Sequence, residues 1–284
     1  MDRIKKHPIL YCFVIFIICA VARIIEYFLI RTDESFFAEN FLHKLFGIIL
    51  LSVIMIVSKN KWRDIGFTRN GFVKQTEKGL LLGTACFVVA YSIECIILYI
   101  VNGNVVLGFY ASGFSLNGEM AQQTGIEFVL LCIIFNIINV WMEEGIFRGF
   151  FTKLLEDIPY NKSILLIAFL FGIWHWVMPF RDYLEGNSTI ANLLVMGIGY
   201  IVLAGIMSLK WSLLYKMTGS IWMGLGDHLF NNVMVTNLVH VISNNEADNM
   251  QIVRIMIGQL LSFIIVLFVR SFARLSRWRI CLER

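Results

Sequence analysis

Charged residues and proline are scarce in this sequence. Only 15% of its 284 residues are Asp, Glu, Lys or Arg, three are proline, and 58% are hydrophobic. Soluble domains carry about 25% charged and about 45–50% apolar residues, so this composition excludes an ordinary soluble domain. It also excludes a disordered chain, which needs high charge and low hydrophobicity. A helical membrane protein is the class that remains.

Cysteine is too sparse and too scattered for a disulfide framework. The six cysteines form no C-x-x-C pair, and none pairs with a histidine at metal-ligand spacing. Five lie in apolar stretches, and Cys281 lies in the basic C-terminal tail. We therefore expect reduced, structural thiols.

The sequence contains several long runs of apolar residues. A membrane-spanning helix needs roughly 20 apolar residues at about 1.5 Å of rise each. Eight stretches fit, which predicts an all-α, polytopic protein of the cell membrane with about eight transmembrane helices. The predicted spans are 8–30, 43–58, 79–101, 125–147, 162–178, 193–215, 219–242 and 250–271.

The distribution of lysine and arginine predicts how these spans are oriented. Most of the 24 basic residues, Lys210 among them, fall before the first span, in alternate linkers or in the tail. Those on the opposite side are Arg31, Lys44, Arg181 and Arg254. By the positive-inside rule, both termini are cytoplasmic and the number of spans is even. Because topology accounts for the basic residues, we expect the lipid bilayer and no nucleic acid as a partner.

Ionisable side chains inside the spans are few, and insertion scales assign roughly 2.5–3.5 kcal/mol to each. Arg23 and Glu26 lie three positions apart, so we expect them to neutralise one another. Glu94 stands alone in its span, either protonated or paired with another helix. The others are Glu143, Glu144, His175, Asp227, His228 and, at the end of a span, His240.

One predicted span carries two neighbouring glutamates. Asn136, Asn139 and Glu143 share a helix face at i, i+3 and i+7. Glu144 and Arg148, at i and i+4 on an adjoining face, have the spacing of an intrahelical ion pair. We therefore expect the two carboxylates to point in different directions, with Glu143 free for chemistry.

Two further spans place histidines at a similar depth. His175 lies in one, and His228 shares a face with Asn232 in the other. Counted from the nearest lysines, Glu143, His175 and His228 lie about 15, 20 and 18 Å from the cytoplasmic end. Residues that only pack helices together have no reason to coincide in depth, so this set predicts a buried functional site.

The residue types in this set suit amide hydrolysis by water. A glutamate with a histidine activates water, and a histidine with an asparagine donates to the oxyanion of an attacked carbonyl. No serine or cysteine stands beside them as a nucleophile. Two alternatives stay open: the carboxylates and histidines could ligate zinc, although an H-E-x-x-H helix is missing, or they could only hydrogen-bond helices together.

Three motifs at these positions resemble those of the CAAX protease and bacteriocin-processing (Abi) family of intramembrane peptidases, which includes the CAAX prenyl endopeptidases. The E-E-x-x-x-R motif stands at 143–148, the F-x-x-x-H motif at Phe171 to His175, and the H-x-x-x-N motif at His228 to Asn232. The resemblance divides the chain into a family-like core at 125–242, three N-terminal helices and a linker at 1–124, and a last helix and tail at 243–284.

The resemblance implies an eight-helix peptidase with a cavity open to the cytoplasmic side. It implies that Glu143 with His175 activates water and that His228 with Asn232 stabilises the oxyanion. The other motif residues, Glu144, Arg148 and Phe171, and the nearby Asn139 would support the site.

The resemblance leaves the metal and the substrate open. Family members are often labelled metalloproteases, whereas the residues here favour a metal-free route. Any zinc would take Glu143, His175 and His228 as ligands. We expect a membrane-associated peptide or protein as substrate: a CAAX protein, a pheromone or a bacteriocin precursor. A non-catalytic immunity or scaffold protein of the same fold is the alternative. A transporter that uses Glu94, Glu143 and the histidines as a proton path is less favoured, because the sequence has no internal repeat.

Overall fold

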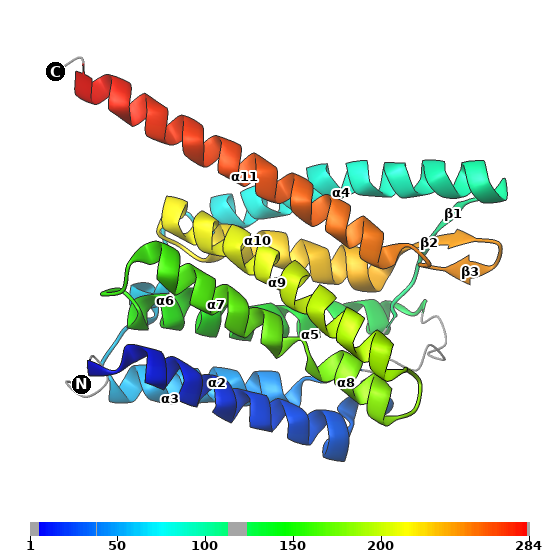
Figure 1. Ribbon diagram of the computed structural model, residues 1–284, viewed down its shortest axis with the longest axis horizontal. Coiled ribbons are helices and arrows are strands. Elements are labelled where there is room, and N and C mark those ends of the chain that lie inside the picture. The colour runs from blue at the N-terminus through cyan, green and yellow to red at the C-terminus, as the bar shows by residue number, and fades with distance from the viewer. Residues whose placement is uncertain (1–5, 38, 113–123, 283–284) are drawn as a thin grey trace.

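The computed structural model describes residues 6–37, 39–112 and 124–282, with side chains described up to residue 272. Helices dominate it (Figure 1). The α-helices are α2 (Pro8–Ile25), α3 (Leu42–Val57), α4 (Phe72–Asn102), α5 (Ile126–Glu143), α6 (Phe151–Leu154), α7 (Tyr160–Trp174), α8 (Val177–Leu184), α9 (Ile190–Thr218), α10 (Trp222–Phe230) and α11 (Gln251–Leu282). π-Helical segments continue α2 (Glu26–Ile30), α5 (Glu144–Phe150) and α10 (Asn231–Leu238), and 3-10 turns form at Thr32–Glu34 and Trp62–Ile65.

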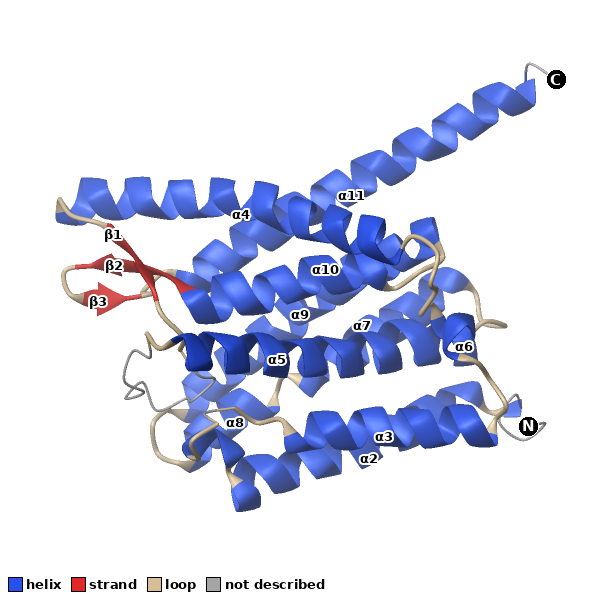
Figure 2. Cartoon of the chain, turned by 180° about the vertical axis from the view of Figure 1, so that it is seen from behind, coloured by secondary structure: helices blue, strands red, loops and turns tan. Residues whose placement is uncertain are grey.

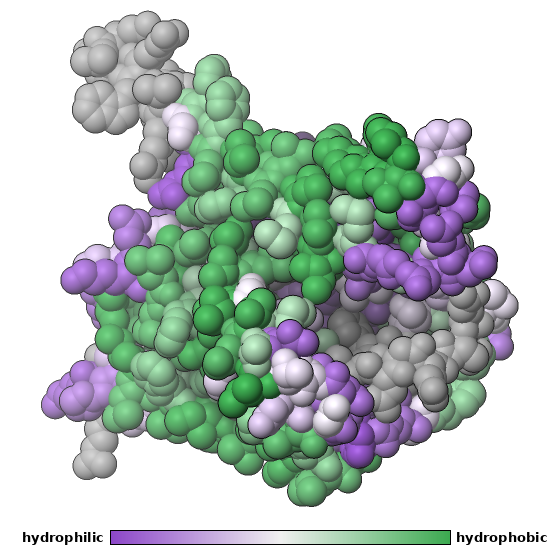
Figure 3. All heavy atoms as spheres, turned by 45° about the vertical axis from the view of Figure 1, so that its right-hand side comes forward, coloured by the Kyte–Doolittle hydropathy of each residue, from purple (hydrophilic) through white to green (hydrophobic). Residues whose placement is uncertain are grey.

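The apolar helices confirm an all-α membrane fold. Among the residues that the structure describes, six helical stretches are long and apolar enough to cross a membrane, and α3 is a shorter apolar helix. The six are Pro8–Glu34, Phe72–Asn102, Ile126–Leu154, Tyr160–Leu184, Ile190–Thr218 and Gln251–Phe272. Apolar side chains cover much of the outer surface, as a lipid-facing bundle requires (Figure 3). The count of eight spans and the cytoplasmic termini stay predictions.

The span predicted at 219–242 differs from the structure at its end. Helix α10 and its π-helical continuation stop at Leu238, and the chain continues as strand β2 (Val239–Ser243). Strand β2 pairs antiparallel with β1 (Val106–Phe109) and with β3 (Glu246–Ala247). The β-branched residues of β2 suit a strand once a partner strand is available. That partner comes from a distant part of the sequence, so the hydropathy of the segment did not reveal it.

Both termini lie at one end of the bundle, and the sheet lies at the other (Figures 1 and 2). Helices α2 and α3 run side by side along one edge, and α4 and α11 meet at the opposite edge, with α5, α7, α9 and α10 between them. Helix α10 approaches α4 closely because both present glycine there. A Cβ on Gly79 would lie 2.1 Å from the Met223 carbonyl oxygen, and one on Gly226 would lie 2.4 Å from that of Thr76. These contacts hold the third motif in place.

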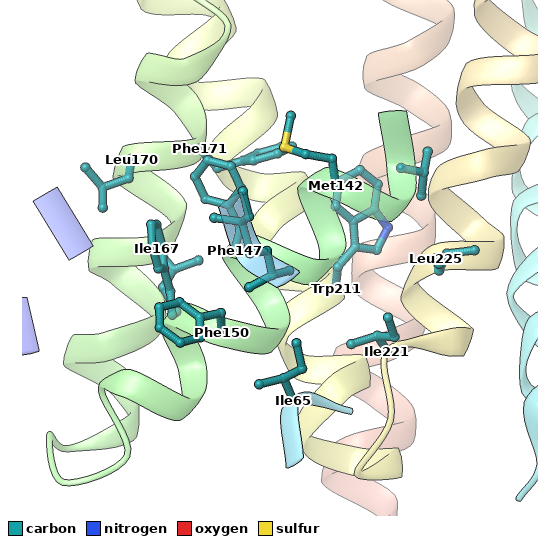
Figure 4. Packing of buried hydrophobic residues seen from close by; sticks show 14 of the residues in the cluster. Ile65, Met142, Phe147, Phe150, Ile167, Leu170, Phe171, Trp211, Ile221 and Leu225 are labelled. Atoms are coloured by element: carbon teal, nitrogen blue, oxygen red, sulfur yellow. The ribbon is translucent and has the colours of Figure 1, made fainter. Parts of the chain in front are cut away.

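Buried apolar side chains from several helices pack into one cluster (Figure 4). The rings of Phe147 and Phe171, from two different motifs, meet edge to face with centroids 5.1 Å apart. Trp211 of α9 and Ile65 of the linker between α3 and α4 are completely buried in the same cluster. Five cysteines fall within the described side chains, and all are free, as predicted; Cys281 lies outside them.

Three cations that the sequence placed in a linker or toward the end of a span are buried in the structure, each with a carboxylate from another element. Lys210 Nζ lies 2.5 Å from Asp227, Arg181 lies 2.7 Å from Asp33, and Arg254 lies 2.8 Å from Glu94. Lys210 therefore lies inside the helix bundle and gives no support to the predicted orientation. Buried charges need a partner, and here the partner comes from a neighbouring helix that the sequence does not identify. Glu94, the isolated carboxylate of the third predicted span, thus has a counter-ion.

The predicted pairing of Arg23 with Glu26 is also wrong. Glu26 accepts hydrogen bonds from the backbone N–H groups of Leu42 and His43, at 2.9 and 2.6 Å, and so satisfies the first turn of α3. Arg23 instead donates to the carbonyl oxygen of Trp174 at 2.8 Å. The unsatisfied N–H groups at a helix start attract the carboxylate more than its neighbour in sequence does.

The end of the molecule that carries the sheet is held by a polar cluster. His240 of β2 stacks on Tyr110 with ring centroids 3.9 Å apart, and its Nδ1 lies 2.5 Å from Asp248. Arg254 donates to the other oxygen of Asp248 at 2.8 Å. Burial raises the pKa of the Asp248 carboxyl, but hydrogen bonds from His240 and Arg254 outweigh burial and hold the pKa below its ordinary value.

Candidate active site

A cavity of about 900 Å³ lies between the helices. The structure brings all four predicted catalytic residues to its wall: Glu143, His175, His228 and Asn232. Of the predicted supporting residues, Asn139 and Phe171 also line the cavity. Glu144 and Arg148 are completely buried and are not among the lining residues. Residues from α5, α7 and α10, far apart in the sequence, thus form one polar site.

Glu143 is held at one of its two carboxylate oxygens. Oε1 accepts a hydrogen bond from the indole Nε1 of Trp174 at 2.8 Å. Oε2 has no hydrogen-bond partner among the described residues and lies 3.5 Å from Nε2 of His228. The indole therefore orients the carboxylate, while one oxygen remains available to a bound molecule.

Glu144 contacts the imidazole of His228 on the side opposite to Glu143. Nδ1 of His228 lies 3.0 Å from Oε1 of Glu144, and Arg148 lies 3.5 Å from that oxygen. The predicted Glu144–Arg148 pair is confirmed, whereas the expectation that the two carboxylates face apart is not: both reach His228. Neighbouring positions on a helix point about 100° apart, so the two long side chains can both reach a ring that lies between them.

Arg148 lies beside Glu144 and packs against two aromatic rings. Its guanidinium carbon lies 3.9 Å from the ring centroid of Phe171 and 4.8 Å from that of Trp211. The cation thus lies against two aromatic rings that are nearly perpendicular to one another, with centroids 6.0 Å apart, and such contacts are favourable for a buried guanidinium. Arg148 therefore supports Glu144 through charge and packing.

His175 is oriented by the backbone of its own motif. The residue follows the last turn of α7, where Nδ1 lies 2.9 Å from the carbonyl oxygen of Phe171. A carbonyl oxygen only accepts hydrogen bonds, so Nδ1 carries the proton and Nε2 keeps a lone pair. The motif geometry thus presents a ring nitrogen that can take up a proton.

His228 is also supported by Trp211, which the sequence did not indicate, and through Trp211 by Asp227, which it did. Its ring stacks on the indole of Trp211, with centroids 3.9 Å apart and an interplanar angle of 16°. Trp211 Nε1 donates to Asp227 at 2.7 Å, and Asp227 pairs with Lys210. Asp227 could be singled out from the sequence, because it is an ionisable residue inside a predicted span. Trp211 could not, because the contact between Trp211 and His228 joins two different helices.

A chain of side-chain amides sets the orientation of Asn232. Lys210 Nζ donates to Oε1 of Gln259 at 2.6 Å, and Gln259 Nε2 donates to Oδ1 of Asn231 at 3.0 Å. Asn231 Nδ2 then donates to Oδ1 of Asn232 at 3.1 Å. Because an ammonium group only donates, it fixes the direction of every bond that follows. The Nδ2 group of Asn232 is left as a donor with no partner among the described residues.

The geometry of the candidate zinc ligands does not fit a zinc site. Among the described residues, no group of three or more His, Cys, Asp or Glu side chains is arranged to hold a metal ion. A tetrahedral site would need these donors to converge on one point. We assign no chemical step to a metal.

The cavity extends to the end of the molecule that carries the sheet. Its outer lining includes Tyr110, Asp248 and Gln251, and the surface is hollowed on this side (Figure 3). Both termini lie at the opposite end (Figure 1). A cavity open to the cytoplasm, as the resemblance implied, is therefore incompatible with cytoplasmic termini, as the basic residues predict.

The positions of the exposed lysine and arginine residues favour cytoplasmic termini over a cavity that opens to the cytoplasm. Lys61, Arg69, Lys162 and Lys216 are exposed near the end that holds the termini. At the end that carries the sheet, Arg31, Lys44, Arg181 and Arg254 are all in ion pairs. We therefore expect the mouth of the cavity to be extracytoplasmic.

Cysteine labelling in intact cells tests this orientation. Asn187→Cys, in the exposed loop after α8, should react with a membrane-impermeant maleimide. Lys61→Cys, at the other end, should react only after the membrane is permeabilised. The reverse pattern would place the mouth in the cytoplasm, and the unsubstituted chain reports the background from the native cysteines.

Residues 125–234 match the protein family described as Type II CAAX prenyl endopeptidase Rce1-like. The match contains all three motifs and the helices α5, α7 and α10 that carry the site. It confirms the resemblance that the motifs indicated. A comparison with curated proteins gave no match.

Proposed function

We propose that this chain, which carries a Rce1-like domain, is an endopeptidase of the cell membrane that hydrolyses a peptide bond of a membrane-associated peptide or protein. The family supports a CAAX-type intramembrane protease in general. The observation that carries the proposal is the carboxylate of Glu143, oriented at one oxygen and unpartnered at the other, in the wall of a cavity shared with His175, His228 and Asn232.

In this mechanism Glu143 and His175 activate water. Glu143 or His175 accepts a proton from the water molecule while the water oxygen forms a bond to the carbonyl carbon of the peptide. The proton is then delivered to the nitrogen of the leaving amine as the carbon–nitrogen bond breaks, so the products are a carboxylic acid and an amine. A positioned general base contributes about 10²–10⁴ in rate.

His228 and Asn232 are proposed to stabilise the oxyanion. Nδ1 of His228 lies beside Glu144 and Nε2 faces Glu143, so Nε2 is the ring nitrogen that donates into the site when it carries a proton. In the transition state the Nε2 proton and the free amide of Asn232 are donors for the oxygen that gains charge. Each such donor is typically worth about 10²–10³ in rate.

The test is a cleavage assay with purified protein in lipid vesicles. A farnesylated peptide that ends in a CAAX sequence and a peptide precursor with a leader serve as two substrates, with mass spectrometry of the products. We expect cleavage of one of them, unchanged by a zinc chelator, because the proposed base and donors need no metal. The absence of cleavage of either peptide would contradict the proposal. Loss of activity on chelation that added zinc restores would overturn the metal-free mechanism.

A further inference from the structure

Arg23 of α2 differs from the other buried arginines. It is 5% exposed and lines the cavity, yet no described carboxylate lies within ion-pair distance of its guanidinium. Arg148, Arg181 and Arg254 are equally buried, and each has such a carboxylate. A buried cation without a counter-ion is costly unless a ligand supplies the charge.

The hydrogen bonds of Arg23 leave part of the guanidinium unused. Nη1 donates to the Trp174 carbonyl oxygen at 2.8 Å and Nη2 to the Tyr27 hydroxyl at 3.3 Å, whereas Nε has no partner. The group lies over the indole of Trp174, with its central carbon 4.4 Å from the ring centroid. Two neutral acceptors and a ring hold its plane, while the charge and several of its five donors remain unmatched.

Trp174 joins this cation to the proposed reaction centre. Its backbone carbonyl accepts from Arg23, and its indole donates to Glu143. The cation and the proposed base are thus separated by a single residue. An extended peptide spans about 3.3–3.6 Å per residue, so a group bound at Arg23 lies within a few residues of the bond that is cut.

We propose that Arg23 binds a carboxylate of the peptide substrate and thereby selects where the chain is cut. The guanidinium matches a carboxylate with two parallel N–H···O bonds, which gives direction as well as attraction. Two carboxylates occur in peptides: the C-terminal group and the side chains of Asp and Glu. Helix α2 lies outside residues 125–234, so this selectivity is a property of the chain beyond the matched family region. The inference rests on the proposed peptidase function.

Matched peptides separate the sources of the carboxylate. One peptide has a free C-terminal acid, the second has a C-terminal amide, and the third has its Asp and Glu residues replaced by Asn and Gln. We expect kcat/KM to fall by about 10- to 100-fold for the peptide that lacks the recognised carboxylate, the range of a hydrogen bond between charged groups. Arg23→Gln should abolish that difference by raising KM for the preferred peptide and should leave the disfavoured peptide unchanged.

The alternative is that Arg23 only balances the charge of Glu143. In that case Arg23→Gln lowers kcat for all three peptides equally, and this result overturns the proposal, as does an unchanged preference. Arg23→Lys, which keeps the charge, should retain part of the preference and serves if the glutamine variant does not fold. Arg63→Gln removes an exposed guanidinium outside the cavity and should leave the preference as it is.

Binding provides a readout that does not depend on turnover. In the Glu143→Gln background, the peptide with the recognised carboxylate should bind more tightly than its neutral counterpart by the same 10- to 100-fold. Adding Arg23→Gln should remove the difference. Equal binding of the charged and neutral peptides to the Glu143→Gln protein would overturn the inference, whereas cleavage without selectivity would leave the proposed function intact.

Discussion

Replacing Glu143 with glutamine is expected to abolish peptide cleavage while the protein stays folded in the membrane. Glutamine has nearly the same shape, and its oxygen can still accept the hydrogen bond from Trp174. Glutamine cannot take a proton from water, so kcat should fall by a factor of about 10²–10⁴, which is the contribution of a general base. The measurement is kcat in vesicles, with thermal unfolding as the check on folding.

The matched control is Glu156→Gln. Glu156 is exposed in the linker after α6, where it pairs with Lys153, so this variant should keep full activity. Undiminished cleavage by the Glu143→Gln variant would refute the assignment of the base. If that variant cleaves nothing yet still performs its role in cells, the chain acts as a non-catalytic immunity or scaffold protein instead.

Replacing Lys210 with methionine is expected to destabilise the protein strongly. The substitution leaves the buried carboxylate of Asp227 without its counter-ion, which costs about 3–5 kcal/mol. The corresponding fall in Tm is on the order of 10 °C. Activity should fall as well, because Gln259 loses the donor that sets the direction of the amide chain to Asn232.

A second substitution separates these two effects. Lys210→Met with Asp227→Asn removes both charges, so most of the stability should return while the amide chain remains without its anchor. Lys216→Met, two turns later in the same helix and exposed, should change neither property much. A single Lys210→Met variant as stable as the wild type, or a double variant less stable than the single one, would contradict this account.

Several features were predictable because they depend on short stretches of sequence. Apolar length indicates a membrane helix wherever it occurs, and i, i+4 spacing correctly paired Glu144 with Arg148. The three motifs also placed Glu143, His175 and His228 at one depth, and the structure places them around one cavity. Their catalytic roles stay predictions.

Other features depended on which helices lie side by side. Glu26 faced α3 instead of Arg23, and His228 turned out to lie between two glutamates that were expected to face apart. The partner strand of β2 lies more than a hundred residues earlier in the chain, and no local pattern announces it.

The physical reason lies in how a buried charge finds its partner. Scarce charge and long apolar runs suffice to specify a membrane protein, because the bilayer interacts with each segment separately. The few charges left inside must be matched by groups across helix interfaces, and packing alone decides which groups meet. Packing thus places Lys210 behind His228 and Asn232 and leaves Arg23 without a carboxylate beside Trp174.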